Sequence, residues 1–340
     1  MILVTGGTGL VGSHLLYKLV CKNKQVKAIY RRAHTLERVK HVFSYYTENY
    51  NVLFDKIEWI EANLNDIPSL ELAFKNVDYV YHCAAFISFE PNKYYQLRNI
   101  NIEGTANIVN LSISNNIKKL CYVSSIAAVG QEPNPNQFIT EQTEWNPEED
   151  NSIYAITKYG AEMEVWRGTQ EGVPAVVVNP GIILGPGYWK GGSSGSLFRL
   201  IHKGLTYYTS GSTGYVDVWD VCDIMLKLMQ SDIINERYIL VSENLSFYEF
   251  QKKVAQTLDV KSAKKEAGSL LLEIGWRLDW LKSKLLGKRR KLSKQLAKSV
   301  RTKTIYDNTK IKSNLNIEFN SIDNSIKKVS TYYLKDFSKP

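Results

Sequence analysis

Val4-Thr5-Gly6-Gly7-Thr8-Gly9-Leu10-Val11-Gly12, near the start of the chain, is a glycine-rich turn between two patterned segments. An apolar run over residues 2–4 precedes it, and a helical pattern over residues 12–20 follows it. Glycines let the backbone turn sharply and approach phosphate groups, while a helix N-terminus offers free N–H groups and the positive end of its dipole. A strand, a glycine-rich turn and a helix in this order favour a dinucleotide site over a plain turn.

Short apolar runs alternate with helical patterns through the first half of the chain. We expect strands at residues 2–4, 26–30, 79–82, 120–124 and 175–179, and helices at residues 12–20, 67–74, 101–110 and 154–166. Strands that are apolar throughout and alternate with helices indicate a parallel sheet with helices on both faces. The sequence therefore predicts an α/β fold with a Rossmann-type doubly wound sheet, whose cofactor would lie across the carboxyl ends of the strands.

The composition changes after Asn179, where glycines and serines concentrate between residues 181 and 196. Such a stretch is typical of a domain boundary and of a loop on the substrate side. We expect residues 1–180 to form the dinucleotide-binding domain, with residues 216–243 returning to its sheet. The remainder of residues 181–340 would form a smaller, mostly helical substrate domain that includes a basic amphipathic segment.

Charge and cysteine usage narrow the class of protein. The net charge is +9, but residues 261–303 alone hold 14 Lys or Arg and 3 Asp or Glu. The rest of the chain is therefore near neutral, and we expect no nucleic-acid partner. No apolar run reaches the about 18 residues of a membrane span. Because a strand is predicted from residue 2, we expect no signal peptide. The four cysteines form no C-x-x-C pair, so we expect a cytoplasmic protein without a metal site.

Tyr154 and Lys158 stand four residues apart, which places a phenol and an ammonium on one face of a helix. An isolated tyrosine with a pKa of about 10 is a poor acid or base at neutral pH, and a neighbouring cation lowers that pKa. The same spacing recurs twice later in the chain, so the spacing alone is weak. The apolar run that ends in Ser124-Ser125 adds a hydroxyl at the end of a predicted strand, where it could bind a substrate oxygen.

Together these motifs resemble the extended short-chain dehydrogenase/reductase superfamily, that is, the NAD-dependent epimerase/dehydratase family. The chain is most similar to its dihydroflavonol reductase and hydroxysteroid dehydrogenase branch. The matching residues are 5–12, 82–85, 101–105, 124–125, 154–158 and 179–187, in the order that the family shows. The resemblance covers about residues 1–225, and the last third of the chain matches only loosely.

The resemblance implies a role for each matching residue. Tyr154 would be the general acid and base, and Lys158 would hold the nicotinamide ribose and lower the pKa of Tyr154. Ser125, rather than Ser124, would supply the catalytic hydroxyl, and Asn101 would support the site. The expected cofactor contacts, besides Tyr154 and Lys158, are Gly6, Gly9, Leu10, Val11, Gly12, Asn63, Leu64, Ala84, Ala85, Pro180 and Gly181. A homodimer through the helices that carry Asn101 and Tyr154 is also implied.

The end of the second predicted strand bears on the choice of cofactor. NAD-binding proteins carry an acidic residue there for the ribose 2′-hydroxyl, whereas this chain has Tyr30-Arg31-Arg32. A guanidinium binds a 2′-phosphate through charge-assisted hydrogen bonds. We therefore expect NADP(H), with Arg31 and Arg32 as phosphate ligands; NAD is the alternative, in which both arginines are merely solvated.

The substrate is expected to be bulky and fairly apolar. Nucleotide-sugar enzymes of the superfamily carry an arginine where Asn179 stands and another before residues 215–220, and this chain lacks both. The leading hypothesis is an NADP(H)-dependent oxidoreductase acting on a ketone or secondary alcohol. A nucleotide-sugar epimerase or dehydratase and a non-catalytic nucleotide sensor are the alternatives. Four aromatic residues, Tyr188, Trp189, Tyr207 and Tyr208, would suit the substrate pocket or the core equally.

Residues 269–291 combine a predicted helix that has two apolar stripes with a basic cluster at its end. On a helical wheel one apolar stripe holds Leu270, Ile274, Leu278, Leu281 and Leu285, and a second holds Leu272, Trp276 and Trp280. The basic cluster 288–291 follows at once. One stripe can dock on the domain, which leaves the other for a substrate lid, a subunit interface or peripheral contact with an anionic membrane. Ordinary core packing under a solvated basic face is the alternative.

Overall fold

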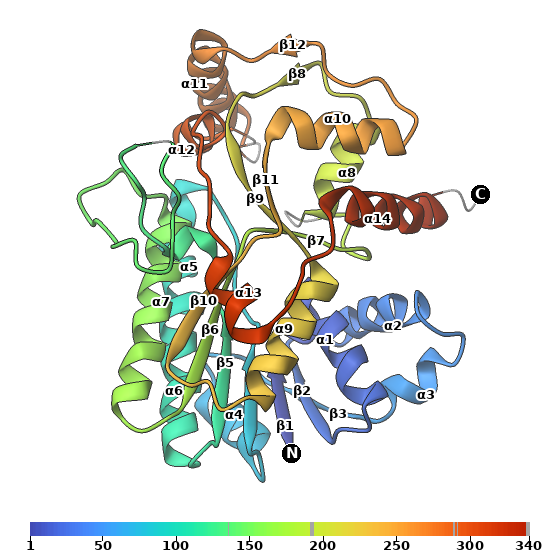
Figure 1. The fold of residues 1–340 in the computed structure, drawn as a ribbon, viewed down its shortest axis with the longest axis vertical. Helices are drawn as coiled ribbons and strands as arrows, with labels where there is room; N and C mark the ends of the chain where they lie inside the picture. Colours follow the sequence, from blue (N-terminus) through green and yellow to red (C-terminus); the bar gives the residue numbers. More distant parts are fainter. Residues whose placement is uncertain (135, 191–193, 288–289, 291, 338–340) are drawn as a thin grey trace.

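The structure of the chain is a computed structural model that describes residues 1–134, 136–190, 194–287, 290 and 292–337. Within the described residues, seven strands form one parallel sheet in the order β10-β6-β5-β4-β1-β2-β3 (Figure 1). The strands are β1 (Ile2–Thr5), β2 (Val26–Tyr30), β3 (Ile57–Glu61), β4 (Tyr79–His82), β5 (Lys119–Val123), β6 (Ala175–Pro180) and β10 (Glu236–Leu240). The strand order reverses between β1 and β4, and ligands of such sheets bind at this point.

Helices cover both faces of the sheet. One face carries α4 (Ile67–Phe74), α6 (Gly104–Ser114) and α7 (Ile153–Gln170), and the other carries α1 (Leu10–Cys21), α2 (Leu36–Ser44) and α9 (Val218–Gln230). Successive strand residues therefore enter different cores: Tyr122 packs under α7, whereas Cys121 packs towards α9. Burial of both faces explains the uninterrupted apolar strands, and it confirms the predicted Rossmann-type doubly wound fold.

The C-terminal part is mostly helical, as predicted. Its helices are α8 (Gly195–His202), α10 (Phe247–Thr257), α11 (Ser269–Leu286), α12 (Lys294–Ser299), α13 (Thr309–Leu315) and α14 (Ile322–Phe337). Two small sheets accompany them among the described residues: β7 (Ile182–Leu184), β9 (Ser212–Asp217) and β11 (Glu243–Ser246) form one, and β8 (Tyr207–Tyr208) and β12 (Lys265–Glu266) form the other. Part of residues 216–243 lies in the parallel sheet as β10 and against α1 as α9.

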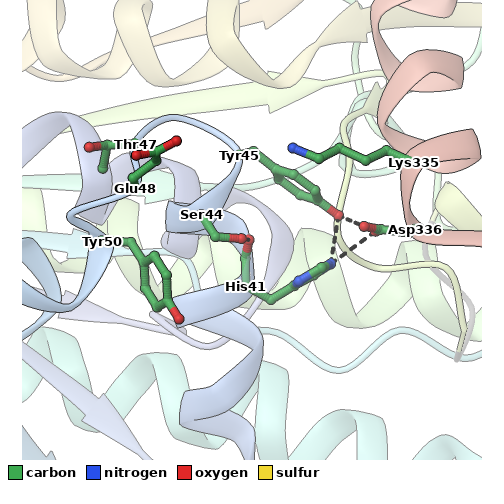
Figure 2. Close-up of a pocket in the computed structure, with 8 residues that line it drawn as sticks. All are labelled: His41, Ser44, Tyr45, Thr47, Glu48, Tyr50, Lys335 and Asp336. Atoms are coloured by element: carbon green, nitrogen blue, oxygen red, sulfur yellow. Dashed lines mark hydrogen bonds and ion pairs between the residues drawn. The ribbon is translucent and has the colours of Figure 1, made fainter. Parts of the chain in front are cut away.

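The last described helix returns to the N-terminal half of the chain. Figure 2 shows a hollow between α2 and α14, where Asp336 lies beside His41 and Tyr45. The Asp336 carboxylate accepts hydrogen bonds from His41 Nε2 at 2.9 Å, from the Trp189 indole N–H at 2.6 Å and from the Tyr45 hydroxyl. These contacts clamp the C-terminal helix onto α2.

Among the described residues, none of the helices has the length and apolar character that crossing a bilayer requires.

Candidate active site

The glycine-rich turn is packed so tightly that only glycine fits. Gly6 has a φ of +67°, and a Cβ there would lie 2.6 Å from the backbone nitrogen of Ala84, just after β4. A Cβ on Gly12 would overlap the carbonyl oxygen of Gly6, which already accepts the N–H of Gly9 at 2.9 Å. The first turn of α1 has no capping side chain and no acidic residue. Its N–H groups and dipole therefore suit a pyrophosphate, and the turn fits a dinucleotide.

Arg31 and Arg32 follow β2 at the same edge of the sheet and are exposed. Among the described residues, neither guanidinium takes part in an ion pair or a side-chain hydrogen bond, so both are available to an anion. The register places Glu61, the last residue of β3, opposite Tyr30, the last residue of β2. The sequence around Arg31 does not predict that a carboxylate lies on the neighbouring strand. A carboxylate can accept a hydrogen bond from the ribose 2′-hydroxyl of NAD, so Glu61 is the local feature that favours NAD over NADP.

The remaining predicted cofactor contacts differ in accessibility. Ala84 directly follows the strand end, and its N–H donates to the Thr5 hydroxyl at 3.3 Å. Ala85 and Asn63 are exposed, whereas the Leu64 side chain is buried against Gly104 at the start of α6. Leu10 and Val11 begin α1. The structure thus brings these residues to the carboxyl edge of the sheet, with Leu64 turned inward.

Ser125 and Tyr154 meet at the carboxyl end of β5. Ser125 begins a short 3-10 turn, and its hydroxyl accepts a hydrogen bond from the N–H of Ala127 at 3.2 Å. Tyr154 lies in the first turn of α7, which the Ser152 hydroxyl caps by accepting from the N–H of Ala155. Burial raises the pKa of the Tyr154 phenol to about 12, and its hydrogen bond with Ser125 acts in the opposite direction. A protonated phenol and a hydroxyl are therefore paired at this edge.

Lys158 is bound to the sheet rather than to Tyr154. Its ammonium donates to the phenol oxygen of Tyr122 at 2.6 Å and to the carbonyl oxygen of Val123 at 2.9 Å. Burial lowers the pKa of Lys158 to about 7, and the charge of Glu162 opposes that shift. The predicted lowering of the Tyr154 pKa by Lys158 is wrong for this structure, because burial dominates at the phenol and the ammonium points to β5.

Asn101 ties two segments together behind the candidate catalytic pair. It lies in a π-helical turn, Arg98–Glu103, directly before α6. Its amide nitrogen donates to the carbonyl oxygen of Phe86 at 3.0 Å and to the hydroxyl of Thr157 at 3.2 Å, and its amide oxygen accepts the N–H of Phe86 at 2.7 Å. Because Thr157 precedes Lys158, Asn101 holds the loop after β4 against the part of α7 that carries the ammonium.

Glu162, which the sequence pattern does not single out, is the centre of a buried network under the site. Its carboxylate accepts hydrogen bonds from the Ser124 hydroxyl at 2.6 Å, from the Asn179 amide at 2.9 Å and from the Arg237 guanidinium at 3.2 Å. The same Asn179 amide donates to the carbonyl oxygen of Ser125 at 3.0 Å. The signal in the sequence is the four-residue spacing, which places Glu162 one turn beyond Lys158 on the same face of α7.

The aromatic residues considered for a substrate pocket are not gathered in one place. The Tyr188 hydroxyl donates to the carbonyl oxygen of Thr8 in the glycine-rich turn at 2.8 Å. Burial raises the pKa of Tyr188 to about 12, while its hydrogen bond with Ser13 and the charge of Arg38 act in the opposite direction. Trp189 belongs to the main core, and the other two aromatics form β8. Core packing is therefore the role of Trp189.

A different aromatic residue lies next to Tyr154. The Phe89 ring meets the Tyr154 ring edge-on with centroids 5.5 Å apart, and Phe89 is 40% exposed. On the other side, Pro180 ends β6, and a Cβ on the following Gly181 would overlap the carbonyl oxygen of Gly214 on β9. Close packing between β6 and β9 is thus sufficient to require glycine at position 181.

The fold, its switch point and the tyrosine–lysine helix are those of an extended short-chain dehydrogenase/reductase. Residues 2–240 match the NAD dependent epimerase/dehydratase family, and the chain belongs to it. "Putative dihydroflavonol 4-reductase" of Synechocystis sp. is 29% identical over 248 residues, 72% of this chain and 68% of that protein. "Sterol demethylase protein B" of Methylococcus capsulatus is 26% identical over 243 residues, 71% of this chain and 70% of that protein.

Solved structures repeat the fold over nearly the whole chain. The crystal structure of gox2253 has a TM-score of 0.81 at 21% identity and covers 99% of this chain and 98% of its own. UDP-glucose 4-epimerase of Thermotoga maritima, solved with UDP-glucose, has a TM-score of 0.76 at 22% identity and covers 99% of both chains. At these identities the likeness establishes the shared fold.

Proposed function

We propose that the protein is an NADP(H)-dependent oxidoreductase that interconverts a ketone and a secondary alcohol on a bulky, fairly apolar molecule. The observation that carries the proposal is that the Ser125 hydroxyl and the Tyr154 phenol lie close enough to affect each other at the sheet edge that also holds the glycine-rich turn. Membership of a family of NAD-dependent epimerases and dehydratases supports the choice of an enzyme over a nucleotide sensor.

The chain's own residues would bind and protonate the substrate oxygen. Since the pKa of Tyr154 is about 12, its phenol is protonated at neutral pH and can donate a hydrogen bond, and then a proton, to a carbonyl oxygen. The Ser125 hydroxyl offers a second donor to the same oxygen. When bound, the nicotinamide would supply the hydride to the carbonyl carbon or accept it in the reverse direction.

Arg31 and Arg32 support NADP(H) as the cofactor. Both are exposed at the end of β2, and charge-assisted hydrogen bonds from a guanidinium to a phosphate are among the strongest available to a protein. Arg38 on α2, the helix that follows β2, is a further exposed cation. Glu61 beside Tyr30 is the feature that favours NAD, because a carboxylate can accept the ribose 2′-hydroxyl that NAD retains.

Phe89 and Asn179 support an apolar substrate. Phe89 exposes an aromatic surface at the ring of Tyr154, where a hydrophobic substrate would gain contact. Asn179 is fully buried and bound to Ser125 and Glu162, so this position offers a substrate diphosphate no cation. Relatives named as a dihydroflavonol reductase and as cinnamoyl-CoA reductases agree with a reductase, and relatives named as UDP-glucose 4-epimerases keep the epimerase as the second candidate.

The first experiment identifies the nucleotide released from the purified, denatured protein by mass spectrometry and then titrates NADPH and NADH. A reductase exchanges its cofactor in each cycle, so we expect little bound nucleotide and tighter binding of NADPH. Replacing Arg31 and Arg32 together by alanine should weaken NADPH binding about tenfold or more and spare NADH. Arg98→Ala, at an exposed arginine paired with Glu103, is the matched control. Near-stoichiometric bound NAD would overturn the proposal in favour of an epimerase.

Activity then tests the catalytic pair. A panel of ketones with NADPH, and of secondary alcohols with NADP, should include a substrate that the protein turns over. Tyr154→Phe should reduce kcat at least about a hundredfold because the proton donor is lost. Retention of normal turnover by this variant, with a substrate in hand, contradicts the assigned role.

A homodimer through α6 and α7 is part of the same proposal. Ile156 and Met163 expose apolar surface on α7, at 39% and 36% of each residue. Light scattering should report twice the mass of the chain, and Ile156→Glu should shift it to that of one chain. A single-chain mass for the unaltered protein rules this interface out.

A further inference from the structure

We propose that α11 lies in the surface of an anionic phospholipid bilayer, with its exposed apolar face among the acyl chains. This inference is independent of the catalytic proposal. In Figure 1, α11 lies at the end of the molecule opposite the N-terminus, beside α12 and away from the parallel sheet.

The face of α11 that points to solvent is apolar. Five side chains of one predicted stripe are exposed by 44% or more: Leu270, Ile274, Leu278, Leu281 and Leu285. At 3.6 residues per turn their positions span about 80° of the helix circumference, close to the width of a face that normally packs against a core. Exposed apolar side chains that stand singly are ordinary, but a continuous stripe over a helix of 18 residues marks a contact surface.

The opposite face of α11 is already occupied. Leu272 is buried with Ala267 and Ala297 in a small cluster, and Trp276 packs against it. Asp279 accepts the backbone N–H of Leu292 at 3.0 Å on this docked side. The helix is therefore held in place by α12 and its flanks, and the exposed stripe remains for another partner.

Basic side chains flank the exposed stripe. Lys282 borders it on one side and Lys284 on the other, and both are exposed. Glu273 is bound by the Arg277 guanidinium at 2.5 Å and by the Trp276 indole N–H at 3.0 Å, so its negative charge is compensated. Trp280 is 45% exposed beside Lys284, whose ammonium lies 5.3 Å from the ring centroid. Tryptophan next to lysine at the edge of an apolar face is typical of a helix at the headgroup level of a membrane.

The positive charge of the segment around α11 favours an anionic membrane over a second copy of the chain as the partner of its exposed face. Residues 261–303 hold 14 basic and 3 acidic residues, so two copies joined through α11 would bring two strongly positive segments together. An anionic bilayer instead complements that charge while it buries the apolar stripe, and each basic residue near such a surface adds to the attraction. Lys288, Arg289 and Lys291 of the basic cluster lie outside the described residues and contribute only to this charge count.

The test is co-sedimentation of the full chain with vesicles. We expect binding to phosphatidylcholine vesicles that contain about one third phosphatidylglycerol, much weaker binding to pure phosphatidylcholine, and release as salt rises from about 0.1 M to 0.5 M. Absence of binding to the anionic vesicles overturns the proposal. Equal binding to both kinds of vesicle at all salt concentrations also overturns it, because the charge would then have no part.

Two pairs of variants separate the apolar and the basic contributions. Leu278→Glu should lower the partition coefficient about tenfold or more, because one buried leucine is lost and a negative charge is added. Leu72→Glu, at a leucine of α4 that is 54% exposed against 60% for Leu278, is the matched control and should bind normally. Lys282→Glu with Lys284→Glu should weaken binding to anionic vesicles and flatten the salt dependence, whereas Lys22→Glu with Lys24→Glu should not.

Folding and self-association are checked on the same samples. All substituted side chains are exposed, so circular dichroism and the melting temperature should match those of the unaltered protein. Equal vesicle binding by Leu278→Glu and the unaltered protein contradicts the proposal. A protein that fails to bind vesicles, but whose mass in light scattering falls on Leu278→Glu substitution, would show instead that α11 joins two copies.

Discussion

The ammonium nitrogen of Lys158 lies 2.6 Å from the phenol oxygen of Tyr122 on β5. Both groups are buried, and burial raises the pKa of Tyr122 well above its ordinary value while it lowers that of Lys158 to about 7. The phenol therefore stays neutral and acts as an acceptor for the ammonium. Tyr122 sets the position from which Lys158 serves the candidate site.

Tyr122→Phe should destabilise the protein by about 1.5–3 kcal/mol, because a buried ammonium loses one of its two acceptors. The effect should be larger at about pH 6, where Lys158 carries its charge, than on the alkaline side of its pKa. Denaturant unfolding at both pH values measures it. Tyr81→Phe, on the neighbouring strand but facing the other core, is the control and should be nearly neutral. A loss that is the same at both pH values would show that the ammonium is not involved.

Glu162→Gln should cost about 3–5 kcal/mol, because it leaves the Arg237 guanidinium without its buried counter-charge and turns an amide N–H towards groups that are themselves donors. Glu164→Gln on the same helix breaks only the partly exposed pair with Arg167, so it should cost less than about 1 kcal/mol. Unfolding free energies of the two variants give the comparison. Similar losses of unfolding free energy in both variants would mean that the buried network around Glu162 stabilises the protein no more than the exposed ion pair does.

Stability should fall in acid because of two buried histidines. Burial lowers the pKa of His14 to about 4 and that of His82 to about 3. Below about pH 6.5 the unfolded chain binds protons at both sites while the folded chain does not, so the unfolding free energy decreases as the pH falls towards these values. Each histidine contributes at most about 1.4 kcal/mol per pH unit. A pH series of denaturant titrations on His14→Gln should give a shallower slope, with exposed His34→Gln as the control.

Asp336→Ala should loosen the docking of α14 onto α2. The substitution removes the acceptor of the buried Trp189 indole N–H and of His41, for an expected loss of about 1–3 kcal/mol. Hydrogen exchange should speed up in α14 more than in the parallel sheet. Asp323→Ala, which breaks the exposed pair with Lys253 at the start of the same helix, should leave that exchange pattern intact.

The sequence pattern predicts the central strands well and the edge strand poorly. Strands β2 and β4 have the predicted bounds, because both of their faces are buried and every residue can be apolar. The edge strand β3, Ile57–Glu61, is missing from the prediction. It mixes apolar side chains with two glutamates, since a strand with only one sheet neighbour stays partly in water.

The residues of the candidate site are predictable where a motif records their spacing along one element. The motifs predict the glycine-rich turn, Ser125, Tyr154 and Asn101 as site residues in this way. Tyr122 and Arg237 cannot be found from spacing, because their partners stand 36 and 75 residues away and meet them only through the sheet. For the same reason the sequence shows Lys158 one turn from Tyr154 but does not show that β5 holds its ammonium.

The clamp between α2 and α14 also sets an order of events during synthesis. His41 and Asp336 are separated by 295 positions in the chain. At translation rates of about 5–20 residues per second, α2 leaves the ribosome roughly 15 s to a minute before its partner exists. Over that interval the first three strands and their helices lack their contact with α14, so they must be stable without it or be bound by a chaperone. The docking of α14 onto α2 is therefore among the last steps in the folding of this chain.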